Sequence, residues 1–337
     1  MDSNVEVPPE LVEFIKTNSR FIIAGHKEPD GDCIGSQLAL HSALVRLGKD
    51  AVICSPGPFK RTELRGLAGK FKAVSQVPEF NLEPDAKLPD TKIIIVDCTG
   101  RDRTGEIHEF IMKFPCAVID HHSTVNHPPS TRKEPVYVDA NSPSCTLLVY
   151  KLIQALGLDI TEEEATFLLF GICTDTGFFR HLTEKNSDVF EATAKMIRRG
   201  ANPKNIFNII NGGKTLSSRI LIGKILSRTE SYFDGKLLVS YETLEEFNSF
   251  GLINRDSDTL YQLLLSVDGV QAALIIRQEC AENCTVSLRS VDKIDVEQIA
   301  SSFGGGGHKN ASGLTMKGDI SFVKQNMLKL FSDIFDR

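Results

Sequence analysis

Short apolar runs alternate with stretches of helical spacing along the first half of the chain. The runs are rich in Ile, Val and Ala and are bounded by polar turns, as buried strands are. They occupy residues 21–25, 51–54, 92–97 and 116–120. Apolar residues at helical spacing fill 33–47 and 146–156. A further helix is predicted from Thr161, where Glu164 completes a capping box, through Phe170 to a turn at 171–177. This alternation predicts a parallel sheet with crossover helices.

The second half follows a different pattern. Residues 186–226 have helical spacing without strand runs, interrupted at Gly200, Pro203 and Gly212-Gly213. Asp234-Gly235 lies between two apolar runs and predicts a hairpin. Further strands are expected at 270–279 and 285–290, then a helix at 295–303, a glycine loop and a closing amphipathic helix. We therefore predict an α/β protein with a parallel-sheet domain at 1–185, a helical linker at 186–226 and a smaller α/β domain at 227–337.

Composition narrows the class of protein. A chain of 337 residues with 41% hydrophobic and 24% charged residues is typical of a globular protein of two domains. The net charge of −6 disfavours a protein that wraps long duplex nucleic acid. The sequence shows no apolar stretch of about 18 residues and no secretion signal at its start, so we expect a cytoplasmic protein without a membrane partner. Its eight cysteines, Cys280 and Cys284 included, fit reduced thiols better than a zinc site.

Acidic and imidazole side chains follow four of the predicted elements. They are His26, Asp30 and Asp32 after the first run, Asp97 after the third, Asp120, His121 and His122 at the end of the fourth, and Asp175 after the helical segment. Ligands of open parallel sheets bind at the carboxyl ends of the strands, so we expect these segments to converge on one site.

Several carboxylates at one sheet edge repel one another unless cations lie between them. Carboxylate and imidazole donors suit Mn²⁺ ahead of zinc or iron, with no thiolate required. The number of donors exceeds the needs of one ion. Two ions about 3.5–4 Å apart, bridged by a carboxylate and a hydroxide, form the arrangement that attacks phosphoryl centres in line. Gly31 is expected to let the chain turn so that Asp30 and Asp32 face different ions.

Taken together, these motifs resemble the DHH phosphoesterase family over nearly the whole chain. HKEPDGDCIGS, VDCTGRDRTG, IDHHSTV and GICTDTGFFRH are similar to its four motifs, and residues 287–313 resemble the DHH-associated C-terminal domain. Within the family, the chain looks most similar to the NrnA-type branch of nano-RNases and pAp phosphatases. The related phosphodiesterases acting on cyclic-di-AMP or pApA come next.

The resemblance implies a role for each residue. One ion would be held by His26, Asp30 and the bridging Asp97, and the other by Asp32, His121, Asp175 and Asp97. His122 would face the scissile phosphate, and Asp120 would orient an imidazole from behind. The implied substrate contacts are Arg289, Gly305, Gly306, Gly307 and His308, with Arg103 and Arg180 as further phosphate contacts.

Two departures from the family pattern are visible. Cys33 occupies a position where a small alanine is usual, a change expected to be harmless. The segment 143–149 lacks the usual polar helix start, which leaves Ser144 as the expected substrate contact from that helix.

The expected activity is hydrolysis, by a metal-bridging hydroxide, of short oligoribonucleotides to mononucleotides, of 3′-phosphoadenosine 5′-phosphate (pAp) to AMP, or of both. A cyclic-di-AMP or pApA phosphodiesterase is the nearest alternative, and a nucleotide sensor without turnover is a remote one. The nucleotide-gripping glycines disfavour a pyrophosphatase or exopolyphosphatase, and the acidic charge balance disfavours a processive exonuclease. The main substrate, the direction of oligonucleotide degradation and the presence of a homodimer stay open.

Overall fold

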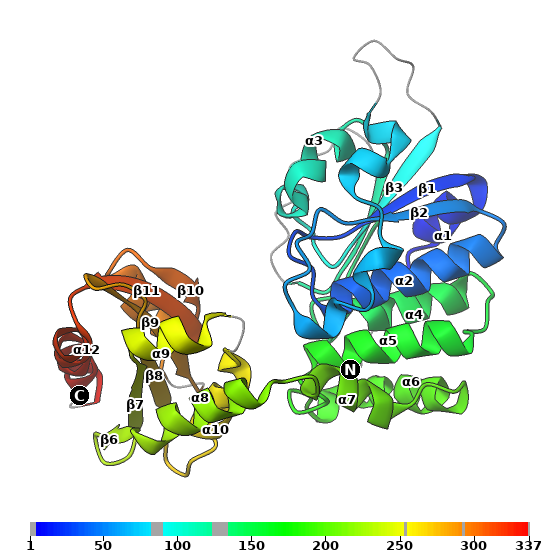
Figure 1. The fold of residues 1–337 in the computed structure, drawn as a ribbon. Helices are drawn as coiled ribbons and strands as arrows, with labels where there is room; N and C mark the ends of the chain where they lie inside the picture. Colours follow the sequence, from blue (N-terminus) through cyan, green and yellow to red (C-terminus); the bar gives the residue numbers. More distant parts are fainter. Residues whose placement is uncertain (1–4, 82–89, 123–133, 253–254, 292–293, 336–337) are drawn as a thin grey trace. The chain divides into compact units, whose positions relative to one another are not determined.

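The computed structural model describes residues 5–81, 90–122, 134–252, 255–291 and 294–335. Residues 123–125 of the predicted third motif lie outside these ranges. The chain divides into two compact units, Met1–Gly213 and Lys214–Arg337, which are coloured along the sequence in Figure 1. Each is described by itself.

A five-stranded parallel sheet forms the centre of the first unit. Its strands are β1 (Arg20–Ala24), β2 (Asp50–Cys54), β3 (Thr91–Val96), β4 (Cys116–Asp120) and β5 (Val136–Val138), in the order β2-β1-β3-β4-β5. The four strands expected from the apolar runs are present, and the parallel sheet is confirmed. The edge strand β5, which has only three residues, was not predicted. All five strands end at the same edge, so the residues that follow β1, β3 and β4 are brought together there.

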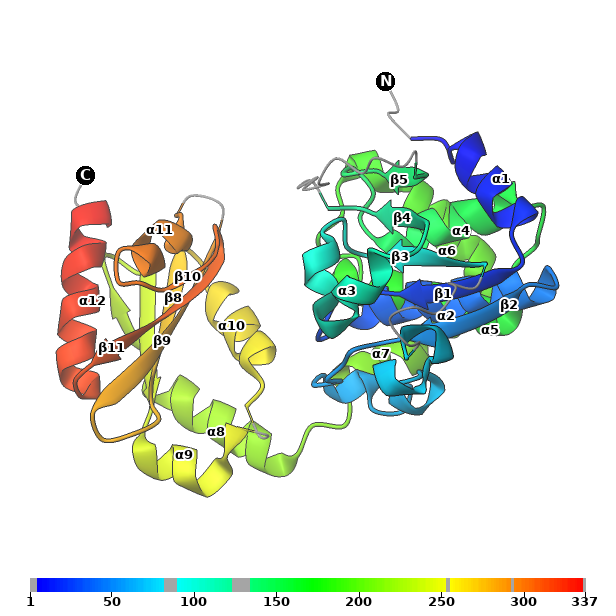
Figure 2. The ribbon, with the colours of Figure 1, turned by 90° about the horizontal axis from the view of Figure 1, so that it is seen from above.

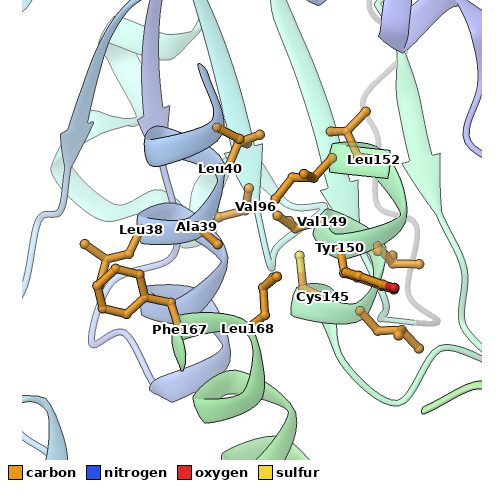
Figure 3. Close-up of a cluster of buried hydrophobic side chains, with 14 of the residues drawn as sticks. Leu38, Ala39, Leu40, Val96, Cys145, Val149, Tyr150, Leu152, Phe167 and Leu168 are labelled. Atoms are coloured by element: carbon orange, nitrogen blue, oxygen red, sulfur yellow. The ribbon is translucent and has the colours of Figure 1, made fainter. Parts of the chain in front are cut away.

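Helices cover one face of this sheet, and shorter helical segments cover the other. The first layer contains α2 (Gly31–Arg46) and α4 (Cys145–Ala155), whose apolar side chains meet those of the sheet, including Val96 on β3 (Figure 3). Helix α5 (Glu162–Asp175) packs against α2 and α4. On the opposite face, α3 (His108–Ile111) and the 3₁₀ segment η5 (Arg101–Ile107) pack over alternate strand residues. The remaining elements of this unit are α1 (Pro9–Thr17), η1 (Thr62–Leu64), η2 (Ala68–Lys70), η3 (Val74–Gln76), η4 (Pro78–Phe80) and η6 (Glu184–Asn186).

Glycines allow α2, α4 and α5 to approach one another closely. A Cβ at Gly35 would lie 2.5 Å from the carbonyl oxygen of Phe167, and one at Gly171 would lie 2.3 Å from Thr146 Cγ2. A Cβ at Gly31 would lie 2.4 Å from Thr174 Cγ2. Gly31 is therefore explained by helix packing, and not by the turn expected between two aspartates, because it is already the first residue of α2.

Helix α5 extends further than the sequence indicated. Its capping box is present, with Thr161 Oγ1 accepting from the amide of Glu164 and the Glu164 carboxylate accepting from the amide of Thr161. The helix then continues through Gly171 to Asp175, so the expectation of a turn from 171 was wrong. Asp175 is the last residue of a helix whose carboxyl end points to the same edge as the strands.

The segment predicted as a linker is helical but belongs to both units. Helices α6 (Ser187–Arg198) and α7 (Pro203–Asn211) fall in the first unit, whereas α8 (Leu216–Ser227) falls in the second. Helices α6 and α7 lie beside α5 in Figure 1, and α6 also contacts α4. Among the described residues, no helix is long and apolar enough to cross a membrane.

A six-stranded mixed sheet organises the second unit. Its strands are β6 (Glu230–Tyr232), β7 (Leu237–Glu242), β8 (Ala272–Gln278), β9 (Asn283–Ser290), β10 (Gly306–His308) and β11 (Ala311–Lys317), in the order β10-β11-β9-β8-β7-β6. The hairpin at Asp234-Gly235 joins β6 to β7, as predicted. Helices α11 (Val296–Ser301) and α12 (Ile320–Phe335) cover one face of the sheet. The other face carries α8, α9 (Leu244–Phe250) and α10 (Ser257–Leu265), as seen in Figure 2.

Candidate metal centre

His26 is oriented toward the carboxyl ends of the strands by a backbone contact. The residue follows β1, and its Nδ1 lies 2.8 Å from the carbonyl oxygen of Lys27. Because a carbonyl can only accept, Nδ1 carries a proton, and Nε2 is the nitrogen that faces the carboxylates. Nε2 lies 3.4 Å from Asp97 Oδ2 and 3.9 Å from Asp30 Oδ1. An imidazole held in this way presents one nitrogen for a cation.

His121 is arranged in the same manner at the end of β4. Its Nδ1 donates to the carbonyl oxygen of Ser142 at 3.2 Å. Its Nε2 lies 3.4 Å from Asp97 Oδ1, 3.4 Å from Asp175 Oδ2 and 3.8 Å from Asp32 Oδ2. The two imidazoles thus face the same Asp97 carboxylate from opposite oxygens.

Asp97 connects the two halves of the cluster at a strained backbone position. It follows β3 with φ of 61°, in the left-handed region that residues other than glycine seldom adopt. The side chain is 2% exposed, and Oδ1 accepts no hydrogen bond from any described residue. Buried polar atoms nearly always have a partner, so an unpartnered carboxylate oxygen indicates a ligand position.

Asp32 is fixed by the amino end of α4. Its Oδ2 accepts from the amide of Cys145 at 2.6 Å, and its Oδ1 accepts from the amide and the hydroxyl of Thr146 at 2.9 and 2.6 Å. The expected substrate contact from this helix start is not what the structure shows. Ser144 caps the helix by accepting from the amide of Leu147, and the free amides bind Asp32. Anions favour this position because the helix dipole is positive there.

The carboxylate of Asp120 lies behind His122, on the side away from solvent. Asp120 Oδ1 accepts from the amides of His121 and His122 at 2.7 and 3.2 Å and from His122 Nδ1 at 2.7 Å. Burial acts to raise the pKa of Asp120, but the hydrogen bond and charge of His122 outweigh it and lower that pKa. The carboxylate therefore stays charged and holds the proton on Nδ1, which leaves Nε2 of the partly exposed His122 ring available.

Asp30 and Cys33 belong to the His26 side of the cluster. Asp30 caps α2, because its Oδ1 accepts from the amides of Asp32 and Cys33, both at 3.1 Å. The thiol of Cys33 is fully buried, and burial raises its pKa to about 11. Sequence reasoning gave Cys33 no role, although the structure places it beside His26 and Asp97.

The protonation states of the cluster show how much negative charge is concentrated there. Burial, with the charges of Asp97 and Asp175, raises the pKa of Asp32 well above 3.8. Burial also raises the pKa of Asp175 to about 6, opposed by His121 and aided by Asp97. Burial would lower the pKa of His121, but the surrounding carboxylates raise it to about 10. Protonated imidazoles and carboxyls thus compensate the charge that cations would otherwise neutralise.

The donor atoms fall into groups of the size that one ion needs. His26, Cys33 and Asp97 form one group, Asp32, His121 and Asp175 a second, and Asp97, Asp120, His121 and His122 a third; within each group the donor atoms lie within 4.8 Å of one another. Asp97 adjoins His121 as well as His26. The residues therefore fit two divalent cations that share Asp97, with oxygen and nitrogen donors on both sides and the Cys33 sulfur beside the His26 group.

Three arginines surround this edge of the first unit. Arg103 is exposed, and its carbonyl oxygen accepts from the amide of Lys27 at 2.8 Å, next to His26. Arg180 is exposed and folds back so that its Nε donates to the carbonyl oxygen of Gly177 at 2.9 Å. Burial acts to raise the pKa of Asp30, but the hydrogen bond and charge of His26 outweigh it and lower that pKa, with a smaller contribution from the charge of Arg61, a residue that sequence reasoning missed. Its position in the loop after β2 was the available signal.

The residues assigned to substrate binding in the second unit lie on or next to β10 and on β9, which are separated in the sheet by β11. Arg289 on β9 donates to the carbonyl oxygen of Leu288 and lies 5.0 Å from the ring centroid of Tyr261. Backbone pairing connects Ala311 with both Arg289 and His308. Part of the glycine segment is thus the edge strand β10.

The glycines have a structural explanation that the sequence did not indicate. A Cβ at Gly305 would lie 2.3 Å from the carbonyl oxygen of Gly313, and one at Gly307 would lie 2.4 Å from that of Ala311. Close pairing with β11 therefore requires Gly305 and Gly307. A Cβ at Gly306 would face open space, so Gly306 leaves an exposed backbone that a ligand can approach.

Known proteins resemble the chain over both units. The family described as "DHH family, N-terminal domain" matches residues 20–172, and the DHHA1 domain matches residues 234–337. The bifunctional oligoribonuclease and PAP phosphatase NrnA of Thermus thermophilus is 31% identical over 312 residues, which are 91% of this chain and 87% of that protein. The cyclic-di-AMP phosphodiesterase GdpP of Bacillus subtilis is 27% identical over 97% of this chain, which spans 49% of that protein's length. The crystal structure of an exopolyphosphatase-related protein from Bacteroides fragilis superimposes with a TM-score of 0.80 at 25% identity, covering 97% of each chain.

Proposed function

Because this chain belongs to the DHH family of phosphoester hydrolases, we propose that it cleaves short oligoribonucleotides to mononucleotides and pAp to AMP. The observation that carries the proposal is the joint convergence of His26, Asp97 and His121 with the carboxylates around them. The similarity to NrnA of Thermus thermophilus, which extends over most of both proteins, supports the choice of substrates.

Two divalent cations, which we expect to include Mn²⁺, would neutralise the phosphate and supply a nucleophile by lowering the pKa of water. His26, Asp30 and Asp97 would hold one cation, and Asp32, His121, Asp175 and Asp97 the other. The backbone bonds from His26 and His121 keep the coordinating nitrogens aimed at these positions.

His122 is the group best placed to act on the phosphate. Its Nδ1 donates to Asp120, so a proton transferred to a phosphoryl oxygen or to the departing oxygen would come from Nε2 of the doubly protonated ring. Asp120 orients the ring. Arg103 and Arg180 are proposed to contact further phosphates of the substrate, and Arg289, Gly306 and His308 its nucleotide part.

The experiment that tests this function is a Mn²⁺-dependent assay against pAp, pApA, cyclic-di-AMP and oligoribonucleotides of two to 24 residues. We expect turnover per end to be highest for about two to five nucleotides, with a weak salt dependence, because few phosphates are bound. A 24-mer degraded fastest in processive runs would contradict the proposal. Preferential hydrolysis of cyclic-di-AMP would favour the second candidate, which the 27% identity to GdpP supports.

A further inference from the structure

Cys33 is buried on the His26 side of the metal centre. It is the third residue of α2, and its side chain is fully buried. A Cβ built on Gly25 would lie 2.1 Å from Cys33 Sγ. The sulfur is therefore packed against the bare backbone between the end of β1 and His26, a space that only glycine leaves open.

The thiol meets two other donors. Cys33 Sγ, an imidazole nitrogen of His26 and a carboxylate oxygen of Asp97 lie within 4.8 Å of one another, and all three residues are buried. Ligands bound at about 2.0–2.3 Å around one tetrahedral ion are themselves about 3.3–3.8 Å apart. Small side-chain movements would bring these three atoms to that spacing.

Asp97 joins this group to the other side of the centre. It is 2% exposed, its Oδ2 lies 3.4 Å from His26 Nε2, and its Oδ1, on the His121 side, accepts no hydrogen bond from any described residue. A buried carboxylate oxygen without a donor is costly unless a cation satisfies it. The carboxylate that the two sides share therefore lacks a partner for one oxygen, and one of its oxygens lies within 4.8 Å of Cys33 Sγ.

We propose that Cys33 Sγ is a ligand of the cation held by His26 and Asp97, which makes this position selective for Zn²⁺, Co²⁺ or Fe²⁺ over Mn²⁺. The inference rests on the metal centre of the proposed function. Cation binding forms the metal–sulfur bond and releases the thiol proton to solvent. The other position, formed by Asp32, His121 and Asp175, has only oxygen and nitrogen donors and keeps its preference for harder ions. The two positions would then bind different metals.

Titration of the metal-free full-length chain with Co²⁺ tests the inference by absorption spectroscopy. Sulfur ligation gives a near-ultraviolet sulfur-to-cobalt charge-transfer band, whereas oxygen and nitrogen ligands give only weak visible bands. We expect the charge-transfer band in the wild type, its loss in Cys33→Ala and Cys33→Ser, and its retention in Cys284→Ala. Cys284 is a matched control because its thiol is buried in the core of the second unit.

Metal competition gives a second readout that does not depend on activity. The preference of the chain for Zn²⁺ over Mn²⁺ should fall by about tenfold or more in both Cys33 variants. Circular dichroism checks that the variants fold, and the serine variant keeps the side-chain size if alanine destabilises the helix.

Each contrary result has a distinct meaning. Weak visible bands without a charge-transfer band in the wild type would overturn the role of Cys33 and leave the metal centre intact. A charge-transfer band that persists in both Cys33 variants would do the same. Failure of the wild type to bind Co²⁺ at all would overturn the metal centre, and the proposed function with it.

Discussion

Removal of one hydroxyl at the amino end of α4 should separate cation affinity from the chemical step. Thr146 Oγ1 donates to Asp32 Oδ1 at 2.6 Å, and both side chains are shielded from solvent. Thr146→Val keeps the volume of the side chain and deletes this donor. Asp32 still accepts hydrogen bonds from the backbone amides of residues 145 and 146.

The size of the expected loss of cation affinity follows from the charge of the Asp32 carboxylate, which accepts the hydrogen bond. A hydrogen bond to a charged group contributes about 1.5–3 kcal/mol. A cation requires the ionised form of Asp32, which this bond stabilises, so its loss should appear in the cation dissociation constant. Since about 1.4 kcal/mol is a factor of ten, we expect cation binding to weaken by about 10- to 150-fold. Turnover at saturating Mn²⁺ should stay close to wild type, because no group assigned to the phosphate changes.

Calorimetric titration of the metal-free protein with Mn²⁺ measures this change directly. Thr166→Val is the matched control, because Thr166 Oγ1 on α5 donates only to the exposed carbonyl oxygen of Glu162, at 2.9 Å. An unchanged dissociation constant in Thr146→Val would refute the reasoning. An equal change in both variants would refute it as well.

The remaining predictions concern three separate positions. Asp97→Asn should abolish hydrolysis and reduce bound metal below two ions without loss of the fold, and two tightly bound ions with normal turnover would contradict the shared-ligand assignment. Arg289→Ala should lower kcat/KM on pAp, with unchanged metal content, by an amount that corresponds to about 1.5–3 kcal/mol of lost transition-state stabilisation, as loss of one charged contact to the nucleotide would; equal rates would remove Arg289 from the site. Burial acts to raise the pKa of Glu246, but its hydrogen bonds with Arg228 outweigh burial and lower that pKa below 4.5. The pair therefore stabilises the second unit above about pH 4.5, and this stabilisation is lost as the pH falls through the lower pKa of the folded state. Urea unfolding of the wild type and Glu246→Gln should differ at pH 7 and converge in acid, and a difference that persists unchanged would contradict this.

Strong local patterns made the central part of the fold predictable. Four strands of the first sheet contain continuous apolar runs, and the capping box of α5 is a local signal. The expected convergence of His26, Asp97 and His121 needed only the rule that parallel strands end at one edge.

The structure differs from the sequence-based predictions where tertiary packing outweighs local sequence preferences. Gly171 looked like the end of a helix, but it lies inside α5. It is a glycine because Thr146 leaves no space for a side chain at this position. Strand β10 consists of two glycines and a histidine, which have weak strand preference, and pairing with β11 provides its order.

The partners of the site residues were similarly invisible in the sequence. The contact between Asp32 and Thr146 joins residues 114 positions apart. The approach of Cys33 to Asp97 depends on how deeply α2 is inserted between the sheet and α5. Neither spacing nor composition contains this information.

The left-handed backbone of Asp97 predicts opposite rankings of variants by stability and by catalysis. Glycine relieves the backbone strain at φ of 61°, and asparagine tolerates it better than most residues. Both also remove one negative charge from a crowded buried cluster. In a library containing all substitutions at position 97, glycine and asparagine should therefore be the most heat-resistant members, while aspartate alone supports turnover. Selection for thermal resistance alone would therefore replace Asp97 and abolish turnover.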